Sequence, residues 1–267
     1  MTLEIGLILP TSTPDPRQPI LGDVRAAARL AEQLELESVW STDHLIASAP
    51  MVDSTVTLAT AAAVTDHIHI GYNVMLLALR PVAWAAKQIA SLQHVSGDRL
   101  LLGVGTGNPA HGDIGWRAAG VTFTGRGTRT DEALRVLPGL VTGTPTLVNG
   151  VEATLSPAAT MPPILVAGNG TRARRRAAEF ATGWLTIAPD LTTLPAELRE
   201  LQELAKEFDR PAPTVTVVAP GLSTDLHAAA DQLAAHREAG VERVILAPTS
   251  PDWQSDYQRA AQLRATL

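Results

Sequence analysis

An aspartate–histidine pair, Asp43-His44, directly follows the short apolar run Ser38–Ser41. A histidine side chain titrates close to neutral pH, so His44 can accept a proton, release one, or donate a hydrogen bond to a bound heteroatom. The sequence therefore predicts a catalytic role for His44, with Asp43 beside it. The alternative is that Asp43 caps the next segment and that His44 packs beneath its loop.

A glycine-rich segment, Gly103–Pro109, ends another apolar run. Within it, Gly105–Ala110 matches the dinucleotide pattern G-x-G-x-x-A. That pattern requires a helix to begin at this point and an acidic residue about 20 positions later. Pro109, Gly112 and Gly115 follow instead. We therefore reject a Rossmann-type site and predict that the glycines let a flat ring or the backbone approach closely.

The turn Gly168-Asn169-Gly170 lies between an apolar run and a helical pattern that starts at Thr171. Backbone N–H groups at the start of a helix, together with the positive end of its dipole, bind anions. The first turns of this helix carry four arginines: Arg172, Arg174, Arg175 and Arg176. They would oppose the dipole in the absence of an anion. This favours phosphate binding at the turn; the alternative is that the arginines extend into solvent.

Two other chemistries have little support in the sequence. The chain has no cysteine, and His111 and Asp113 have no third metal ligand near them, so we expect no metal site. The two lysines, Lys87 and Lys206, lie outside the predicted strands. This argues against a barrel aldolase or isomerase that uses a strand-borne lysine.

Eight short apolar runs alternate with eight longer amphipathic segments and position these residues. The predicted strands are Glu4–Leu9, Ser38–Ser41, His69–Met75, Arg99–Val104, Pro163–Ala167, Trp184–Ala188, Thr214–Val218 and Arg243–Ala247. The predicted helices are Leu21–Leu34, Ser54–Thr65, Val82–His94, Arg126–Leu140, Thr171–Ala181, Leu194–Phe208, Asp225–Ala239 and Trp253–Leu263. Strict alternation forces parallel pairing through right-handed crossovers. We predict an α/β fold, a single (β/α)8 TIM-barrel domain over residues 1–267, with its chemistry at the carboxyl ends of the strands.

Glycines and long connections add detail to this prediction. Gly97, Gly183 and Gly240 each follow a predicted helix, as left-handed caps do. The connection 105–125 leaves a strand at the catalytic face and is long enough to suggest function. The connection 142–162 lies at the opposite face and is expected to fold back as a hairpin, Thr146–Val148 with Val151–Leu155 around an Asn-Gly turn.

Composition limits the partners. The net charge of −6, from 21 basic and 27 acidic residues, disfavours nucleic-acid binding. No apolar run approaches the ~20 residues of a membrane span, and the amino-terminal segment does not resemble a signal peptide. We expect a cytoplasmic protein that acts on a small molecule, with no nucleic-acid or membrane partner.

The strand ends taken together resemble the bacterial luciferase-like superfamily of flavin- and deazaflavin-dependent oxidoreductases. The resemblance covers essentially the whole chain. It rests on SVWSTDHL, on HIHIGYNVMLLALRPVAWAAKQIASLQHVSGDRLLLGVGTG, on VTFTGRGTRTDEALRVL and on PPILVAGNGTRARRRAAEFATGW. It implies a luciferase-like barrel that binds an isoalloxazine-type ring at its open end.

The resemblance also assigns site residues. Members that use coenzyme F420 often carry Asp-His after strand two, which places His44 near the reactive ring and Asp43 against the ring or the histidine. A bulge with a non-prolyl cis peptide behind the ring corresponds to Asn73–Val74. The implied cofactor-binding residues are Asp43, Asn73, Val74, Thr106, Gly107, Asn108, Gly168, Asn169 and Gly170.

Asn108 departs from the family pattern, because sugar-phosphate dehydrogenases carry a glutamate proton donor there. An amide is no general acid at neutral pH, so His44 is left as the titrating group. The loops after strands six to eight are also short, which suggests a shallow pocket or one completed by a second subunit in a homodimer. Trp116, His111, Met75 and Trp184 are candidates to face an apolar or aromatic substrate.

The resemblance implies hydride transfer between F420 and an unidentified small organic substrate. The first alternative is an FMN-dependent monooxygenase that uses reduced flavin and oxygen. The second is a non-catalytic flavin- or deazaflavin-binding protein. In each case the cofactor would supply the chemistry, and the protein would supply orientation and electrostatics.

Overall fold

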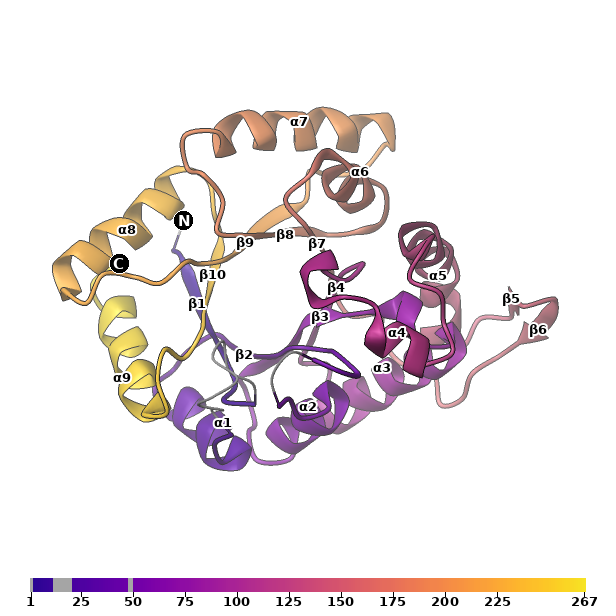
Figure 1. Cartoon of the computed structure of the whole chain (residues 1–267), viewed down its shortest axis with the longest axis horizontal. Helices are drawn as coiled ribbons and strands as arrows, with labels where there is room; N and C mark the ends of the chain where they lie inside the picture. Colours follow the sequence, from indigo (N-terminus) through magenta and orange to yellow (C-terminus); the bar gives the residue numbers. More distant parts are fainter. Residues whose placement is uncertain (1, 12–20, 48–49) are drawn as a thin grey trace.

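Eight parallel strands close into a barrel in the computed structural model, which describes residues 2–11, 21–47 and 50–267. The order around the barrel is β1-β10-β9-β8-β7-β4-β3-β2, and helices surround it (Figure 1). The strands are β1 (Glu4–Ile8), β2 (Ser38–Ser41), β3 (His69–Met75), β4 (Leu100–Val104), β7 (Ile164–Ala167), β8 (Gly183–Ile187), β9 (Thr214–Val218) and β10 (Arg243–Leu246). The predicted (β/α)8 barrel is confirmed.

The surrounding helices also match the predicted segments to within a few residues. They are α1 (Val24–Gln33), α2 (Ser54–Ala62), α3 (Val82–Ser96), α5 (Arg126–Val141), α6 (Thr171–Phe180), α7 (Leu194–Glu207), α8 (Leu226–Glu238) and α9 (Trp253–Arg264). Aspartates accept hydrogen bonds from the first backbone N–H groups of α1, α2, α8 and α9. In the described part of the chain, no helix is long and apolar enough to span a membrane.

Two of the three predicted glycine caps are confirmed. Gly97 and Gly240 follow α3 and α8 with φ of 66° and 95°. The prediction for Gly183 was wrong, because this residue opens β8 and α6 ends earlier, at an extended Ala181. Gly183 serves packing instead: a Cβ there would lie 3.0 Å from the side chain of Leu165.

The barrel has an inner and an outer apolar layer. Inside it, Trp40 packs with side chains from four other strands: Leu101, Leu165, Leu185 and Ile245. The opposite faces of the strands and the inner faces of the helices form the larger outer core. Gly71 makes room for the indole, because a Cβ there would lie 2.2 Å from Cε3 of Trp40.

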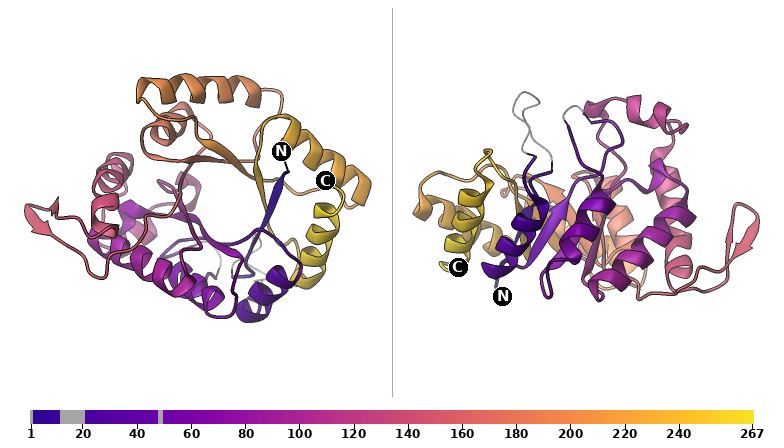
Figure 2. Two further views of the ribbon diagram at one scale, coloured as in Figure 1. Left: turned by 180° about the vertical axis from the view of Figure 1, so that it is seen from behind. Right: turned by 90° about the horizontal axis from the view of Figure 1, so that it is seen from below.

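The two long connections differ in structure. Residues 105–125 follow the carboxyl end of β4 and contain the short helices η2 (Pro109–His111) and α4 (Ile114–Ala118). Residues 142–162 contain an antiparallel hairpin, β5 (Thr146–Val148) and β6 (Val151–Ala153), that projects from the helical ring (Figure 2). The predicted hairpin is confirmed, with a second strand two residues shorter than expected.

Candidate functional site

A cavity of about 530 Å³ opens at the carboxyl ends of β2, β3, β4 and β7. Its lining comprises Thr42, Asp43, His44, Asn73, Val74, Leu76, Gly105, Thr106, Gly107, Asn108, Pro109, His111, Ala167, Gly168, Asn169 and Ile187. The barrel thus brings together all but one of the residues that the sequence assigned to the site. The exception, Gly170, lines a neighbouring cavity.

The side chain of Asp43 connects three segments that surround the cavity. Its buried carboxylate accepts hydrogen bonds from Arg80 Nη2 at 2.8 and 2.7 Å and from the Leu76 backbone N–H at 2.9 Å. The Ser54 hydroxyl donates a further bond, at 3.2 Å. These bonds tie the end of β2 to the start of α2 and to the segment after β3. Sequence reasoning missed Arg80, whose signal was a lone charge in the apolar run LLALRPVAW.

His44 is half-buried and faces a second histidine. The ring centroids of His44 and His111 are 4.7 Å apart, with the planes at 64°. Burial lowers the pKa of His44, the charge of His111 lowers it further, and the carboxylate of Asp43 opposes both effects. The neutral imidazole is therefore the favoured form of His44 near neutral pH.

The floor of the cavity is the irregular end of β3. The Asn73–Val74 peptide is cis, and the register of β3 against β4 shifts between Tyr72 and Met75. Both predicted features, the bulge and the cis bond, are confirmed. Val74 lies against Gly105, where a Cβ would meet its Cγ2 at 2.4 Å. A side chain at position 105, directly after β4, would therefore clash with Val74.

Asn108 uses its side chain within the loop. Its Oδ1 accepts a hydrogen bond from the Ala110 N–H at 3.0 Å, and its backbone carbonyl accepts one from His111 at 3.1 Å. Asn108 is thus the N-cap of η2, the turn that carries His111. Gly107, with φ of 83°, lies against Trp116.

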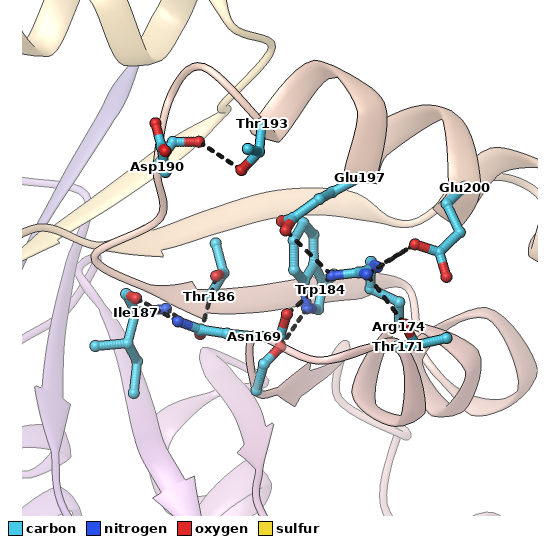
Figure 3. Close-up of polar contacts among 11 residues, drawn as sticks. Asn169, Thr171, Arg174, Trp184, Thr186, Ile187, Asp190, Thr193, Glu197 and Glu200 are labelled. Atoms are coloured by element: carbon cyan, nitrogen blue, oxygen red, sulfur yellow. Dashed lines mark hydrogen bonds and ion pairs between the residues drawn. The ribbon is translucent and has the colours of Figure 1, made fainter.

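The turn after β7 is held by the side chain of Asn169 (Figure 3). Its Oδ1 accepts from the Ile187 N–H at 2.9 Å and from the Thr186 hydroxyl at 3.0 Å, and its Nδ2 donates to the Ile187 carbonyl at 2.7 Å. The Gly168 carbonyl accepts from Trp184 Nε1 at 2.8 Å. These bonds fasten the turn to β8.

Three of the four arginines of α6 are compensated by carboxylates, contrary to the argument from the helix dipole. Arg174 is buried and pairs with Glu200 at 2.7 Å and Glu197 at 3.5 Å (Figure 3). Arg175 pairs with Glu207, and Arg176 with Asp131. Carboxylates of α5 and α7 thus compensate three of the four charges. The sequence could not show this, because the partners are 23 to 45 residues away.

A second cavity, of about 560 Å³, lies where α5 and α6 begin. It shares Thr106, Ala167 and Gly168 with the first cavity. Its other lining residues are Gly125, Arg126, Gly127, Thr128, Asp131, Gly170, Arg172, Ala173 and Arg176. Neither helix has a side-chain N-cap bond. Arg126 Nε is buried without a hydrogen-bond partner among the described residues, so this cavity offers donors and positive charge to an anion.

Of the four residues predicted to face the substrate, only His111 lines the main cavity. Trp116 lies beneath it against Phe123. Met75 and Trp184 were wrongly assigned, since both are fully buried and neither lines the cavity. The bulge in β3 changes which side chains face the opening, and Trp184 turns toward Gly168.

Comparisons with known proteins agree with this architecture. A family model described as luciferase-like monooxygenase matches residues 3–266. An uncharacterized protein of Mycobacterium tuberculosis is 35% identical over 170 residues, which are 61% of this chain and 58% of that protein. The 5,10-methylenetetrahydromethanopterin reductase of Methanolobus tindarius is 29% identical over 209 residues, which are 76% of this chain and 61% of that enzyme. The matched regions span less than two thirds of either relative.

A solved structure shows the same fold over the full chain. The F420-dependent secondary alcohol dehydrogenase in complex with an F420-acetone adduct superposes with a TM-score of 0.83 and 17% sequence identity. The superposition covers 100% of this chain and 99% of that enzyme. At this identity the match concerns the fold alone.

Proposed function

The chain belongs to the luciferase-like monooxygenase family, and we propose that it is an oxidoreductase that transfers a hydride between the deazaflavin coenzyme F420 and a small organic substrate. One observation carries the proposal: the two cavities share Thr106, Ala167 and Gly168 and lie side by side at the strand ends. Together they offer an apolar-floored space with a histidine and an anion-binding space next to it. A cofactor with a flat ring and a phosphate-bearing tail fits this arrangement, with the ring in the first cavity and the phosphate in the second.

The proposed cofactor contacts follow from the lining. Asn73 and Val74 would lie behind the ring, and Thr106, Gly107 and Asn108 would lie along its edge, as in the sequence-based prediction. Backbone N–H groups at Gly170 and the start of α6 would hold the phosphate, with Arg126 and Arg172 beside them. Gly168 allows close approach, and Asn169 keeps the turn in place. F420, when bound, supplies a ring carbon that accepts or donates hydride.

His44 is the proposed proton-transfer residue, and Asp43 is its neighbour that holds the loop. The lowered pKa keeps the imidazole neutral near pH 7, so it can take a proton from the substrate as hydride leaves. In the reverse direction the imidazolium returns that proton. The Asn108 amide is no general acid at neutral pH, and its Oδ1 is occupied in capping η2.

Binding measurements test the cofactor assignment. We expect F420 to raise the melting temperature and to bind with quenching of its fluorescence, more tightly than FMN or reduced FMN. Tight binding of reduced FMN with no affinity for F420 would instead support the FMN-dependent monooxygenase. Cofactor binding without turnover of any substrate, and an effect of His44→Ala on affinity alone, would support a non-catalytic binding protein.

Paired variants test the phosphate site. Replacing Arg126 and Arg172 together with alanine removes two charges that face the second cavity, and F420 affinity should fall at least about tenfold. Arg175→Ala is the matched control, because this side chain leaves the same helix toward Glu207. Equal effects of both changes would contradict the phosphate assignment.

We also propose that residues 1–267 act as one domain, in the cytoplasm, and as a homodimer that completes the shallow pocket. Sedimentation velocity on the full chain checks the last point. A monomer that turns over substrate at full rate at nanomolar protein concentration would exclude a role for the second subunit.

A further inference from the structure

His111 is the second histidine that lines the main cavity, beside His44. His111 is carried by η2 on the connection after β4, and its ring makes an edge contact with that of His44. The two rings lie at different depths: His44 is half-buried, whereas His111 is exposed. An interior imidazole thus contacts an imidazole that reaches solvent.

The local structure holds His111 in this place. Asn108 caps η2 through Oδ1, and its carbonyl accepts the His111 backbone N–H. Asn108 stands where the family resemblance implied an acid, and the asparagine here presents a titratable group three residues later. The loop therefore carries its titratable side chain at position 111 and uses position 108 to cap η2.

We propose that His44 and His111 act as one proton-exchange pair, in which His111 passes protons between His44 and solvent and Asn108 positions it. This rests on the proposed function, since it assigns the proton that accompanies hydride transfer. A water molecule between the rings accepts the proton that leaves His44 and gives one of its own to His111, which then releases a proton to solvent; in the reverse direction, solvent protonates His111 first. The pair carries one proton at a time because two imidazolium rings at this separation repel each other.

The other charged groups near the two histidines are paired with each other or with a neighbour, so they do not replace the effect of His111 on His44. Asp43 faces His44 but is neutralised by Arg80. On the adjoining α4 and its N-cap, Arg117 and Asp113 pair with each other at 3.4 Å. The protonation of His44 therefore depends on burial and on His111 before any other charge.

The first test is an NMR titration of the imidazole resonances in the protein without cofactor, with His44→Gln used to assign the His44 signal. In His111→Gln the titration midpoint of His44 should rise toward its ordinary value. His67→Gln, an exposed histidine at the amino end of β3, should leave it unchanged. An unchanged midpoint in His111→Gln would overturn the pair. Because no cofactor is present, this result is independent of whether F420 binds.

The second test asks whether His111 takes part in proton transfer or only supports the structure of the loop. With F420 and a turned-over substrate, His111→Gln should lower kcat at least about tenfold with little change in KM, and added imidazole should restore part of it. In the protein without cofactor, Asn108→Ala should reproduce the shift of the His44 midpoint seen in His111→Gln, whereas Asn108→Ser, which can still cap η2, should shift it less. Unaltered kcat in His111→Gln would overturn the proton-exchange role.

Discussion

At the residue scale, Asp43 and Arg80 form a largely buried ion pair at 2.7 Å. The side chain of Asp43 is 4% exposed and that of Arg80 is 20% exposed. Removing one partner of such a buried pair leaves an uncompensated charge, which generally costs about 3–5 kcal/mol. The pair also holds the Leu76 N–H, so it sets the geometry of the cavity floor.

We therefore expect Arg80→Met to lower the free energy of unfolding by about 3 kcal/mol or more, as measured by urea denaturation. Arg264→Met is the matched control, because Arg264 pairs with the exposed Glu35 and such surface pairs contribute about 0–1 kcal/mol. Similar losses in both variants would show that Asp43 is not held as the structure indicates.

His44 also makes stability depend on pH. Its pKa is lowered in the folded protein, so the unfolded chain takes up the proton first as the pH falls. The free energy of unfolding should thus decrease as the pH falls below the ordinary value of 6.5, and level off below the folded pKa. His44→Gln should lack this component. We would compare urea unfolding of both proteins from pH 8 to pH 5; parallel curves would contradict the lowered pKa.

At the element scale, the turn between β7 and α6 depends on a side chain rather than on its glycines alone. Asn169 makes three hydrogen bonds to Thr186 and Ile187 of β8. It therefore keeps the start of α6 at a defined distance from the end of β8. The anion binding proposed for the turn would come from the backbone N–H groups that this clamp holds in place.

Asn169→Ala should lower the free energy of unfolding by about 1–3 kcal/mol and weaken phosphate-tail binding as well. Thr186→Val removes only the hydroxyl bond to Oδ1 and should lose less stability. Thermal unfolding and F420 titration measure the two effects. Stability lost equally in both variants would mean that the two bonds between Asn169 and Ile187 contribute little to the clamp.

At the scale of the whole molecule, the closed barrel limits what its interior can accept. Gly71→Ala places a methyl group 2.2 Å from the Trp40 ring and should lower the free energy of unfolding by about 1–3 kcal/mol. Gly221→Ala is the control, because no atom lies within 4 Å of its Cβ position and its φ is ordinary. Chemical denaturation of both checks this; a neutral Gly71→Ala would mean that Trp40 can move within the barrel.

Much of this architecture was determined by the sequence alone. Hydrophobic periodicity, glycine caps and strict alternation depend on near neighbours in the chain, so they located the strands and helices and implied the closed barrel. The positions of Asp43-His44, Asn73–Val74 and Gly168–Gly170 at strand ends followed from that topology. Gly183 shows the limit of local reasoning, since its role is contact with Leu165 of the neighbouring strand.

Only the tertiary structure decided which charges and rings meet. Arg80 reaches Asp43 across 37 residues, Arg176 reaches Asp131 across 45, and His111 meets His44 from a different strand end. Such pairings depend on distances between elements that pack around a common core, and no spacing along the chain encodes them. The strand ends were thus predictable as the place of the site, while the partners of each side chain followed from the folding of the barrel.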